Sequence, residues 1–146
     1  MNYWPHGLAM LVGIGLTLQI GINALAGERL GSPLTGAVLN FAVGLVALVA
    51  VALVSAPRPP PSSFATLPAW AWTGGLLGAA YVASTTILGP RLGATPLLAL
   101  VLAGQLVAAV IVDHYGMVGF PQHSFGWGRG LGIALLSAGA LLIMRK

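Results

Sequence analysis

The chain alternates between long apolar stretches and short polar or proline-rich segments. Five apolar stretches are present, covering residues 8–26, 34–56, 69–88, 96–112 and 126–144. Each has about the 20 residues that a helix needs to cross a bilayer, the fourth being the shortest. The pattern predicts an all-α integral membrane protein, with five transmembrane helices in one domain that comprises residues 1–146.

The segments between the stretches predict where each helix begins and ends. Glu28-Arg29 marks the first turn, and Ser32-Pro33 supplies an N-cap followed by proline at the first helical position. Residues 57–63, rich in proline, are expected to form an extended exposed loop that cannot be helical. Gly89-Pro90-Arg91 is expected to end the third helix, and Thr95-Pro96 to cap the fourth.

Composition excludes several classes of protein. The 146 residues are 58% hydrophobic and 5% charged, with a mean hydropathy of +0.95, whereas a soluble domain has about 25% charged residues. The chain has no cysteine, so disulfides and thiolate metal sites are excluded. Six scattered Lys and Arg residues against two acids are too few for a nucleic-acid surface. Membrane lipid is the expected surrounding.

A weak repeat links two of the turns. Residues 29–34 (Arg-Leu-Gly-Ser-Pro-Leu) recur as residues 91–97 with one insertion, each joining an odd-numbered stretch to the next even one. The repeat favours two helical hairpins plus a fifth helix. The alternative is that any short helix turn recruits glycine, proline and a hydroxyl cap.

The first apolar stretch carries two contrasting faces. Gly15, Gln19 and Asn23 share one helical face, and Gly13, Thr17 and Gly21 lie on nearly the opposite one. The first face carries amides that need partners, and the second carries small residues that allow a neighbouring backbone to approach closely. We interpret this helix as central, lining the cavity of a small membrane transporter.

No Asp, Glu, Lys, Arg or His lies in the middle of any stretch, so polar side chains define the candidate site. An amide that faces lipid is costly, and each should face protein or a water-filled cavity. Interhelical hydrogen bonds, worth about 0.6 kcal/mol each, are the better explanation for single residues. Two stacked amides present more groups than one neighbour satisfies easily. The candidate substrate-binding residues are Gln19, Asn23, Asn40, Tyr81, Ser84 and Gln105.

Asp113 and His114 end the fourth stretch and admit two interpretations. A histidine beside a carboxylate suits a gate or protonation site. A solvated charge at a helix end is also ordinary, and Asp113 could pair with Arg91 or Arg129, which is the favoured interpretation.

Catalysis finds no support in the sequence. The histidines lack metal-ligand spacing with carboxylates, and neither a nucleophile elbow nor a phosphate-binding loop is present. We expect no enzymatic activity, no cofactor and no metal.

The fifth stretch contains a ladder of small residues, Gly126, Gly130, Ala134 and Ala138. Such small-xxx-small patterns allow close helix packing in membranes. We expect this ladder to contribute to a homodimer contact, with the Gly74–Gly78 face of the third stretch as the alternative.

Three segments resemble a known family: residues 15–25, residues 72–82, and Gly104-Gln105 followed by residues 113–116. They are similar to the YdcZ-like inner-membrane family of the drug/metabolite transporter superfamily. The resemblance implies a bacterial inner-membrane protein of five helices, one half of a ten-helix transporter. It also implies that two copies associate, often in opposite orientations.

The resemblance supplies a class of transporter without a substrate. The related small multidrug resistance exporters use a glutamate in the first helix to exchange protons for cations, whereas this chain has only neutral amides there. A neutral, zwitterionic or anionic solute fits such a site at least as well as a cation. A channel or lipid-translocating pore, or a non-transporting accessory subunit, remain alternatives.

Charge counts bear on orientation. With the N-terminus outside, four basic residues (Arg29, Arg91, Arg145 and Lys146) are cytoplasmic and two (Arg58 and Arg129) are outside. This margin is small for the positive-inside rule. We therefore predict dual topology and an antiparallel homodimer.

Overall fold

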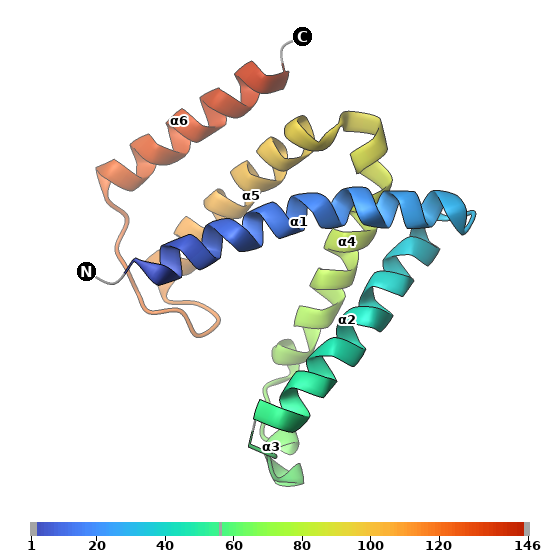
Figure 1. Cartoon of the computed structure of the whole chain (residues 1–146). Helices are drawn as coiled ribbons and strands as arrows, with labels where there is room; N and C mark the ends of the chain where they lie inside the picture. Colours follow the sequence, from blue (N-terminus) through green and yellow to red (C-terminus); the bar gives the residue numbers. More distant parts are fainter. Residues whose placement is uncertain (1–2, 56, 145–146) are drawn as a thin grey trace. The chain divides into compact units, whose positions relative to one another are not determined.

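The computed structural model describes residues 3–55 and 57–144, and all regular structure in these residues is helical (Figure 1). The long helices are α1 (Trp4–Arg29), α2 (Pro33–Ser55), α4 (Thr73–Leu92), α5 (Ala94–Tyr115) and α6 (Trp127–Met144). Two short elements, α3 (Pro61–Ala65) and the 3-10 helix η1 (Ala69–Trp72), lie between α2 and α4. Ala56, the predicted end of the second stretch, and Arg145–Lys146, which enter the charge count, lie outside the described residues.

Four of these helices, α1, α2, α5 and α6, are long and apolar enough to cross a membrane. Helix α4 begins four residues after the predicted start of the third helix, because residues 69–72 form η1, and it continues to Leu92. Its glycines, its hydroxyl side chains and Pro90 make it less apolar than the other long helices. The chain is therefore an all-helical, multi-pass membrane protein, and a fifth crossing by α4 stays a prediction.

Most large apolar side chains on the long helices are exposed. Only 6–11% of the most apolar window of each candidate span is buried within the chain. Such a surface suits a lipid environment, because helices satisfy their backbone hydrogen bonds internally and acyl chains surround the side chains. The few buried residues are consequently informative about which helices pack together.

The prediction of a non-helical segment at residues 57–63 was wrong at its end, because α3 begins at Pro61. Pro60 is extended, with φ −63° and ψ 146°, and Pro61 follows at the first helical position, where a missing N–H costs nothing. The Thr66 hydroxyl donates to the Ser63 carbonyl at 2.9 Å at the other end of this short helix. A proline run can therefore start a helix at its last member.

The predicted boundary between the third and fourth helices was also displaced. Pro90 lies inside α4, which continues to Leu92, since a proline near the end of a helix removes only one hydrogen bond. Helix α5 begins at Ala94, so Thr95 and Pro96 fall in its first turn and do not cap it. Gly93, with φ +81°, makes the junction in a conformation that favours glycine.

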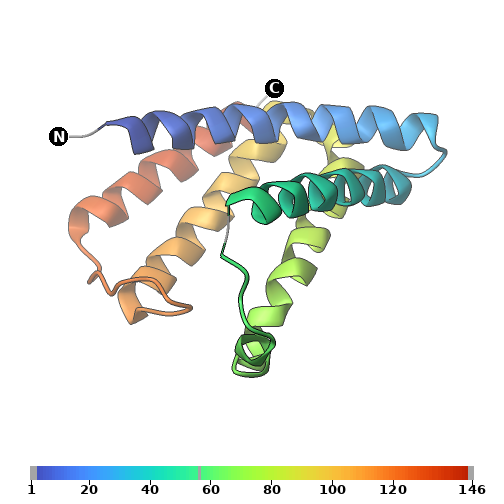
Figure 2. The same ribbon diagram turned by 60° about the horizontal axis from the view of Figure 1, so that its bottom comes forward.

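The chain forms two compact units, Met1–Arg91 and Leu92–Lys146. In the first, α1 packs against α2; in the second, α5 packs against α6 (Figure 2). The repeat predicts a hairpin between the third and fourth stretches, and this pairing stays a prediction because it crosses the two units. Gly31 and Gly93 occupy equivalent places in the two copies of the repeat, and both have positive φ, +76° and +81°.

Helices α1 and α2 are closest at their turn and separate toward their other ends (Figure 1). A Cβ atom on Gly36 would lie 2.5 Å from the Asn23 carbonyl oxygen and 2.7 Å from the Gly27 nitrogen. A Cβ on Gly27 would lie 2.8 Å from the Pro33 Cα. Only glycine permits this approach of two backbones, which positions the polar residues one helical turn farther along each helix.

Candidate functional site

The amide face of α1 packs on α2. The Gln19 Nε2 donates a hydrogen bond to the Asn40 Oδ1 at 3.0 Å. Asn23, one turn after Gln19, is 5% exposed and is the most buried amide side chain among the described residues. Three of the six predicted substrate-binding residues therefore lie on one pair of helices.

A groove of about 300 Å³ runs beside these amides. Asn23 and Asn40 are its polar members, and the remainder of its wall is small or aliphatic. A primary amide offers two donors and an acceptor without formal charge, so the groove combines an apolar surface with a few convergent polar groups. We call it the amide groove; its lining residues are Ile22, Asn23, Ala26, Gly36, Leu39, Asn40, Val43 and Gly44.

Gly27 and Gly36 bring the amides together, although the interpretation of the sequence did not single them out. Asn23 precedes Gly27 by four residues, and Gly36 precedes Asn40 by four, so the two motifs mirror each other about the turn. In the antiparallel hairpin Gly36 lies against the backbone of Asn23 and Gly27, and Asn40 lies one turn farther, within hydrogen-bond distance of Gln19. The mirrored spacing is the signal that could have identified both glycines.

The second face of α1, which carries Gly13, Thr17 and Gly21, makes no close backbone contact with another helix in the described part of the chain. The Thr17 hydroxyl donates to the Gly13 carbonyl at 3.1 Å, within its own helix. A Cβ atom on Gly13 or Gly21 would meet nothing within 4 Å. The close backbone approach therefore occurs at Gly27 and not at these positions.

Helix α4 contributes a different set of hydroxyls from the one expected. Tyr81 is partly buried and Ser84 is exposed, whereas Thr85 and Thr86 are 4% and 1% exposed. The Thr85 and Thr86 hydroxyls donate to carbonyls of their own helix, at 2.9 Å to Tyr81 and 2.7 Å to Val82. The hydroxyls of both threonines therefore have their hydrogen-bond acceptors within α4 itself.

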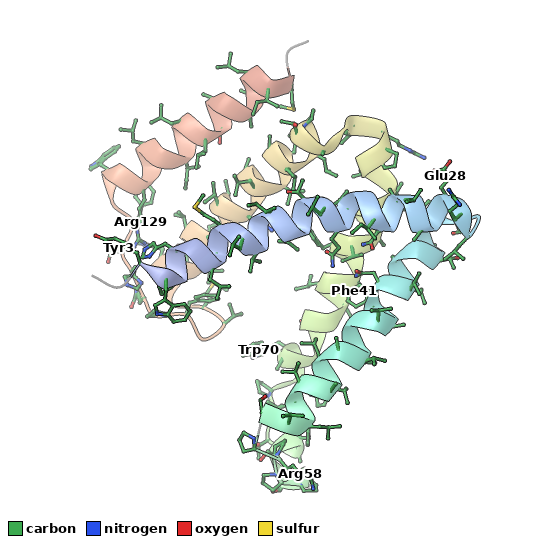
Figure 3. All side chains as sticks on the ribbon, in the orientation of Figure 1. Tyr3, Glu28, Phe41, Arg58, Trp70 and Arg129 are labelled. Atoms are coloured by element: carbon green, nitrogen blue, oxygen red, sulfur yellow. The ribbon has the colours of Figure 1, made fainter. Side chains whose placement is uncertain are left out.

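Helix α4 also touches the first hairpin through an aromatic side chain. A Cβ on Gly78 would lie 3.8 Å from the ring of Phe41 of α2, which is an ordinary packing distance. Figure 3 labels Phe41 on α2. Gly78 is therefore partly covered within the chain itself, whereas a Cβ on Gly74 would meet nothing within 4 Å.

In the second unit, Gln105 lies exposed on α5 and makes no hydrogen bond to another described residue. An amide in the middle of an apolar helix requires a protein or water partner in a membrane. Gln105 therefore indicates that this face of α5 is not simply lipid-facing.

Asp113 and His114 hold the connection between α5 and α6. The Arg129 guanidinium lies 3.3 Å from the Asp113 carboxylate, one of the two pairings considered from sequence. The Phe125 N–H donates to the His114 Nδ1 at 3.2 Å, and the Gln122 Nε2 donates to the His114 carbonyl at 3.0 Å. These contacts fasten residues 116–126 to the end of α5, and a gating role stays a prediction.

The small-residue ladder of α6 faces away from α5. Leu136 and Ala140 lie on the side toward α5, beside a groove of about 170 Å³, whereas Ala134 and Ala138 are exposed on the opposite side. Gly126, the first member of the predicted ladder, precedes α6, which begins at Trp127. A Cβ on Gly130 would lie 2.8 Å from the tip of the Phe125 ring, so this member is covered by its own chain.

The described residues contain no cluster of three or more His, Cys, Asp or Glu side chains that could hold a metal.

Comparison with known proteins places the chain in a family. Residues 4–142 match the family model described as "Putative inner membrane exporter, YdcZ". Comparisons with curated proteins and with solved structures gave no match. The family model covers almost the entire chain, from the start of α1 nearly to the end of α6. It confirms the family resemblance that residues 15–25 and 72–82 indicate. The chain therefore belongs to the YdcZ family of inner-membrane proteins.

Proposed function

We propose that this protein exports a small uncharged or zwitterionic solute, and that the amides of α1 and α2 contact the solute. The observation that carries the proposal is the cluster of Gln19, Asn23 and Asn40 beside a groove of about 300 Å³ in otherwise apolar helices. Family membership supports transport as the class of activity. The choice of solute class follows from the absence of charged residues in the middle of the helices described here.

The amides have capacity for further hydrogen bonds. The bond from Gln19 to Asn40 uses one donor of Gln19 and the carbonyl of Asn40. A second donor and the carbonyl of Gln19, and both donors of Asn40, remain available. A solute with mixed donors and acceptors would match these groups, whereas an isolated cation would find no carboxylate to balance its charge.

The Gln19–Asn40 bond is suited to reversible binding. An interhelical hydrogen bond in a membrane is worth about 0.6 kcal/mol on average. A solute could therefore replace one amide with little loss of stability, and release would restore the bond. Weak competition of this kind suits a transporter, which must discharge its solute in every cycle.

We infer further that two copies form the transporter, in opposite orientations. Gln105 on α5 and the exposed ladder of α6 are surfaces that a second copy would cover. Reporter fusions at the C-terminus should then be active on both sides of the membrane. A strongly one-sided result would replace the antiparallel dimer by a parallel one.

The ladder offers a direct test of the dimer. Ala134→Leu should raise the monomer fraction in crosslinking, because the larger side chain would separate backbones that small residues allow to touch. Ala42→Leu, on an exposed face of α2 away from α1, is the matched control and should leave crosslinking unchanged. Equal crosslinking of both variants would place the dimer contact elsewhere, with Gly74 of α4 as the next candidate.

The test of the site uses Gln19→Leu and Asn23→Leu in proteoliposomes. A counterflow screen with radiolabelled sugars, amino acids and organic cations first identifies a transported class. Transport should then fall at least about tenfold in both variants, since each loses solute contacts worth about 1.4 kcal/mol. Unfolding free energy should change by no more than about one interhelical hydrogen bond.

Thr17→Val is the control for removing a polar side chain from the apolar part of α1, because the Thr17 hydroxyl donates to the Gly13 carbonyl on the face opposite the amides. It should leave the amide groove intact and preserve more transport than Gln19→Leu. If the α1 variants melt early yet transport normally per folded protein, the amides stabilise the helices and do not form the site. Flux without saturation or counterflow would instead favour a channel, and stable copurification with a larger membrane protein would favour an accessory subunit.

A further inference from the structure

A second and larger pocket lies on the opposite face of α1, between α1 and α4 at the end of the first unit that holds the α1–α2 turn. Its volume is about 650 Å³, within the range of about 300–1,000 Å³ that is typical of small-molecule sites. It shares no lining residue with the amide groove. We call it the turn pocket.

The walls of the turn pocket are small and apolar. Helix α1 contributes Gly21, Ala24 and Leu25, where a Cβ on Gly21 would meet nothing within 4 Å. Helix α4 contributes Ile87 beside Thr86, whose hydroxyl is already donated to its own helix. The interior therefore suits the apolar portion of a ligand.

Two opposite charges also line the pocket, Glu28 at the end of α1 and Arg91 at the end of α4. Figure 3 shows Glu28 at the turn, far along the unit from Trp70 and Arg58. Both side chains are exposed, and neither forms an ion pair with another described residue, in contrast to Asp113 with Arg129. The carboxylate can receive an ammonium group, and the guanidinium can bind a carboxylate or phosphate.

We propose that the turn pocket binds a zwitterion, with its cationic group at Glu28, its anionic group at Arg91 and its apolar part beside Leu25. The shared chemistry is a cation and an anion a few bonds apart. A free amino acid and the headgroup of a zwitterionic phospholipid both have it. The site is defined by binding at equilibrium, so it does not depend on the proposed transport or on the amides.

Binding is measured with purified full-length protein in an uncharged detergent. The probes are short-chain phosphatidylcholine and phosphatidylglycerol below their micellar concentrations, leucine, and leucine methyl ester, which retains only the positive charge. The wild-type protein should bind one of the two zwitterions about tenfold more tightly than its singly charged analogue, because a probe of one charge leaves either Glu28 or Arg91 without its ionic contact. Preference for the phosphatidylcholine arm identifies a lipid headgroup, and preference for the leucine arm identifies a free solute.

Single substitutions should change the charge preference. Glu28→Gln should favour the anionic probe, and Arg91→Gln should favour the cationic one, each removing the advantage of the zwitterion. Arg58→Gln, at the other end of the unit, is the control for loss of a basic residue and should bind as the wild type does. Both pocket residues are exposed, so melting temperatures should stay the same.

The double variant Glu28→Arg with Arg91→Glu exchanges the two charges. It provides a second test, in which the preference for the zwitterion is expected to be retained and not lost. It should retain the zwitterion preference, because the ligand can bind in the reverse direction. The proposal is overturned if the wild type does not discriminate, or if both single variants keep the preference of the wild type. Gln19→Leu should leave this binding unchanged, so intact binding without transport would refute only the transport proposal.

Discussion

The two packed hairpins of this protein differ in the contacts that hold their helices together and in where their polar side chains lie. Helices α1 and α2 are joined by residues 30–32, touch through glycine backbones and keep amides between them. Helices α5 and α6 are joined by residues 116–126, meet through aliphatic side chains and keep their ion pair at the end.

Under the proposed function, this difference separates polar residues that stabilise the structure from polar residues that bind the solute. At the end of α5 the ion pair is partly exposed, and the groove between α5 and α6 is lined by aliphatic side chains. Between α1 and α2 the polar groups lie within the apolar length of the helices, where their cost is high unless they have hydrogen-bond partners. Close backbone contact holds that hairpin, so the proposed exchange of amide partners with a solute would leave the packing of α1 on α2 in place.

The largest effect should come from the glycine contact of the first hairpin. In Gly36→Ala the new Cβ would overlap backbone atoms of Asn23 and Gly27, which cannot rotate away as a side chain can. We expect a loss of about 3 kcal/mol in the free energy of unfolding. Unfolding in mixed micelles measures this value.

Gly132→Ala in the second hairpin is the matched control, because a Cβ there would meet nothing within 4 Å. It should be neutral or slightly stabilising, since alanine is the better helix former. Equal stability of the two variants would mean that the backbones of α1 and α2 are farther apart than described.

A smaller effect should come from the amide bond. Asn40→Leu, Gln19→Leu and the double variant form a cycle whose coupling energy should be about 0.6 kcal/mol. The coupling should not depend on salt, because no charge is involved. A coupling above about 2 kcal/mol would show that the bond is a structural fastener, too strong for a solute to displace.

Much of this fold could be predicted because apolar length alone places the helices. The stretches 34–56 and 126–144 agree with α2 and α6 within about one turn. The errors at Pro61, Pro90 and Pro96 have one cause: proline is tolerated in the first turn of a helix and near its end, so its presence does not by itself mark a boundary.

The candidate site could be predicted only in part. Gln19 and Asn23 are visible as polar residues at helical spacing, and a polar group in lipid must have a partner. The bond of Gln19 to Asn40, the contact of Gly27 with Gly36, and the shared pocket of Glu28 with Arg91 depend on how separate helices pack. Periodicity within one helix carries no information on these contacts.

The smallest effect should come from the ion pair of the second hairpin. The side chains of Arg129 and Asp113 are 44% and 34% exposed, and such pairs contribute at most about 1 kcal/mol. A cycle of Asp113→Asn and Arg129→Gln should give a coupling of about 0.5 kcal/mol at low salt. The coupling should vanish near 1 M salt, where the Debye length is about 3 Å.

The salt dependence sharpens the contrast with the amide bond, which should show none. Transport should be unchanged in Asp113→Asn, because the carboxylate fastens a connection at the end of α5. Reduced flux at unchanged stability would instead support the gating role that a carboxylate beside His114 suggests. A coupling that persists in high salt would place the pair in a buried contact with a second copy of the chain, since only an ion pair shielded from solvent escapes screening.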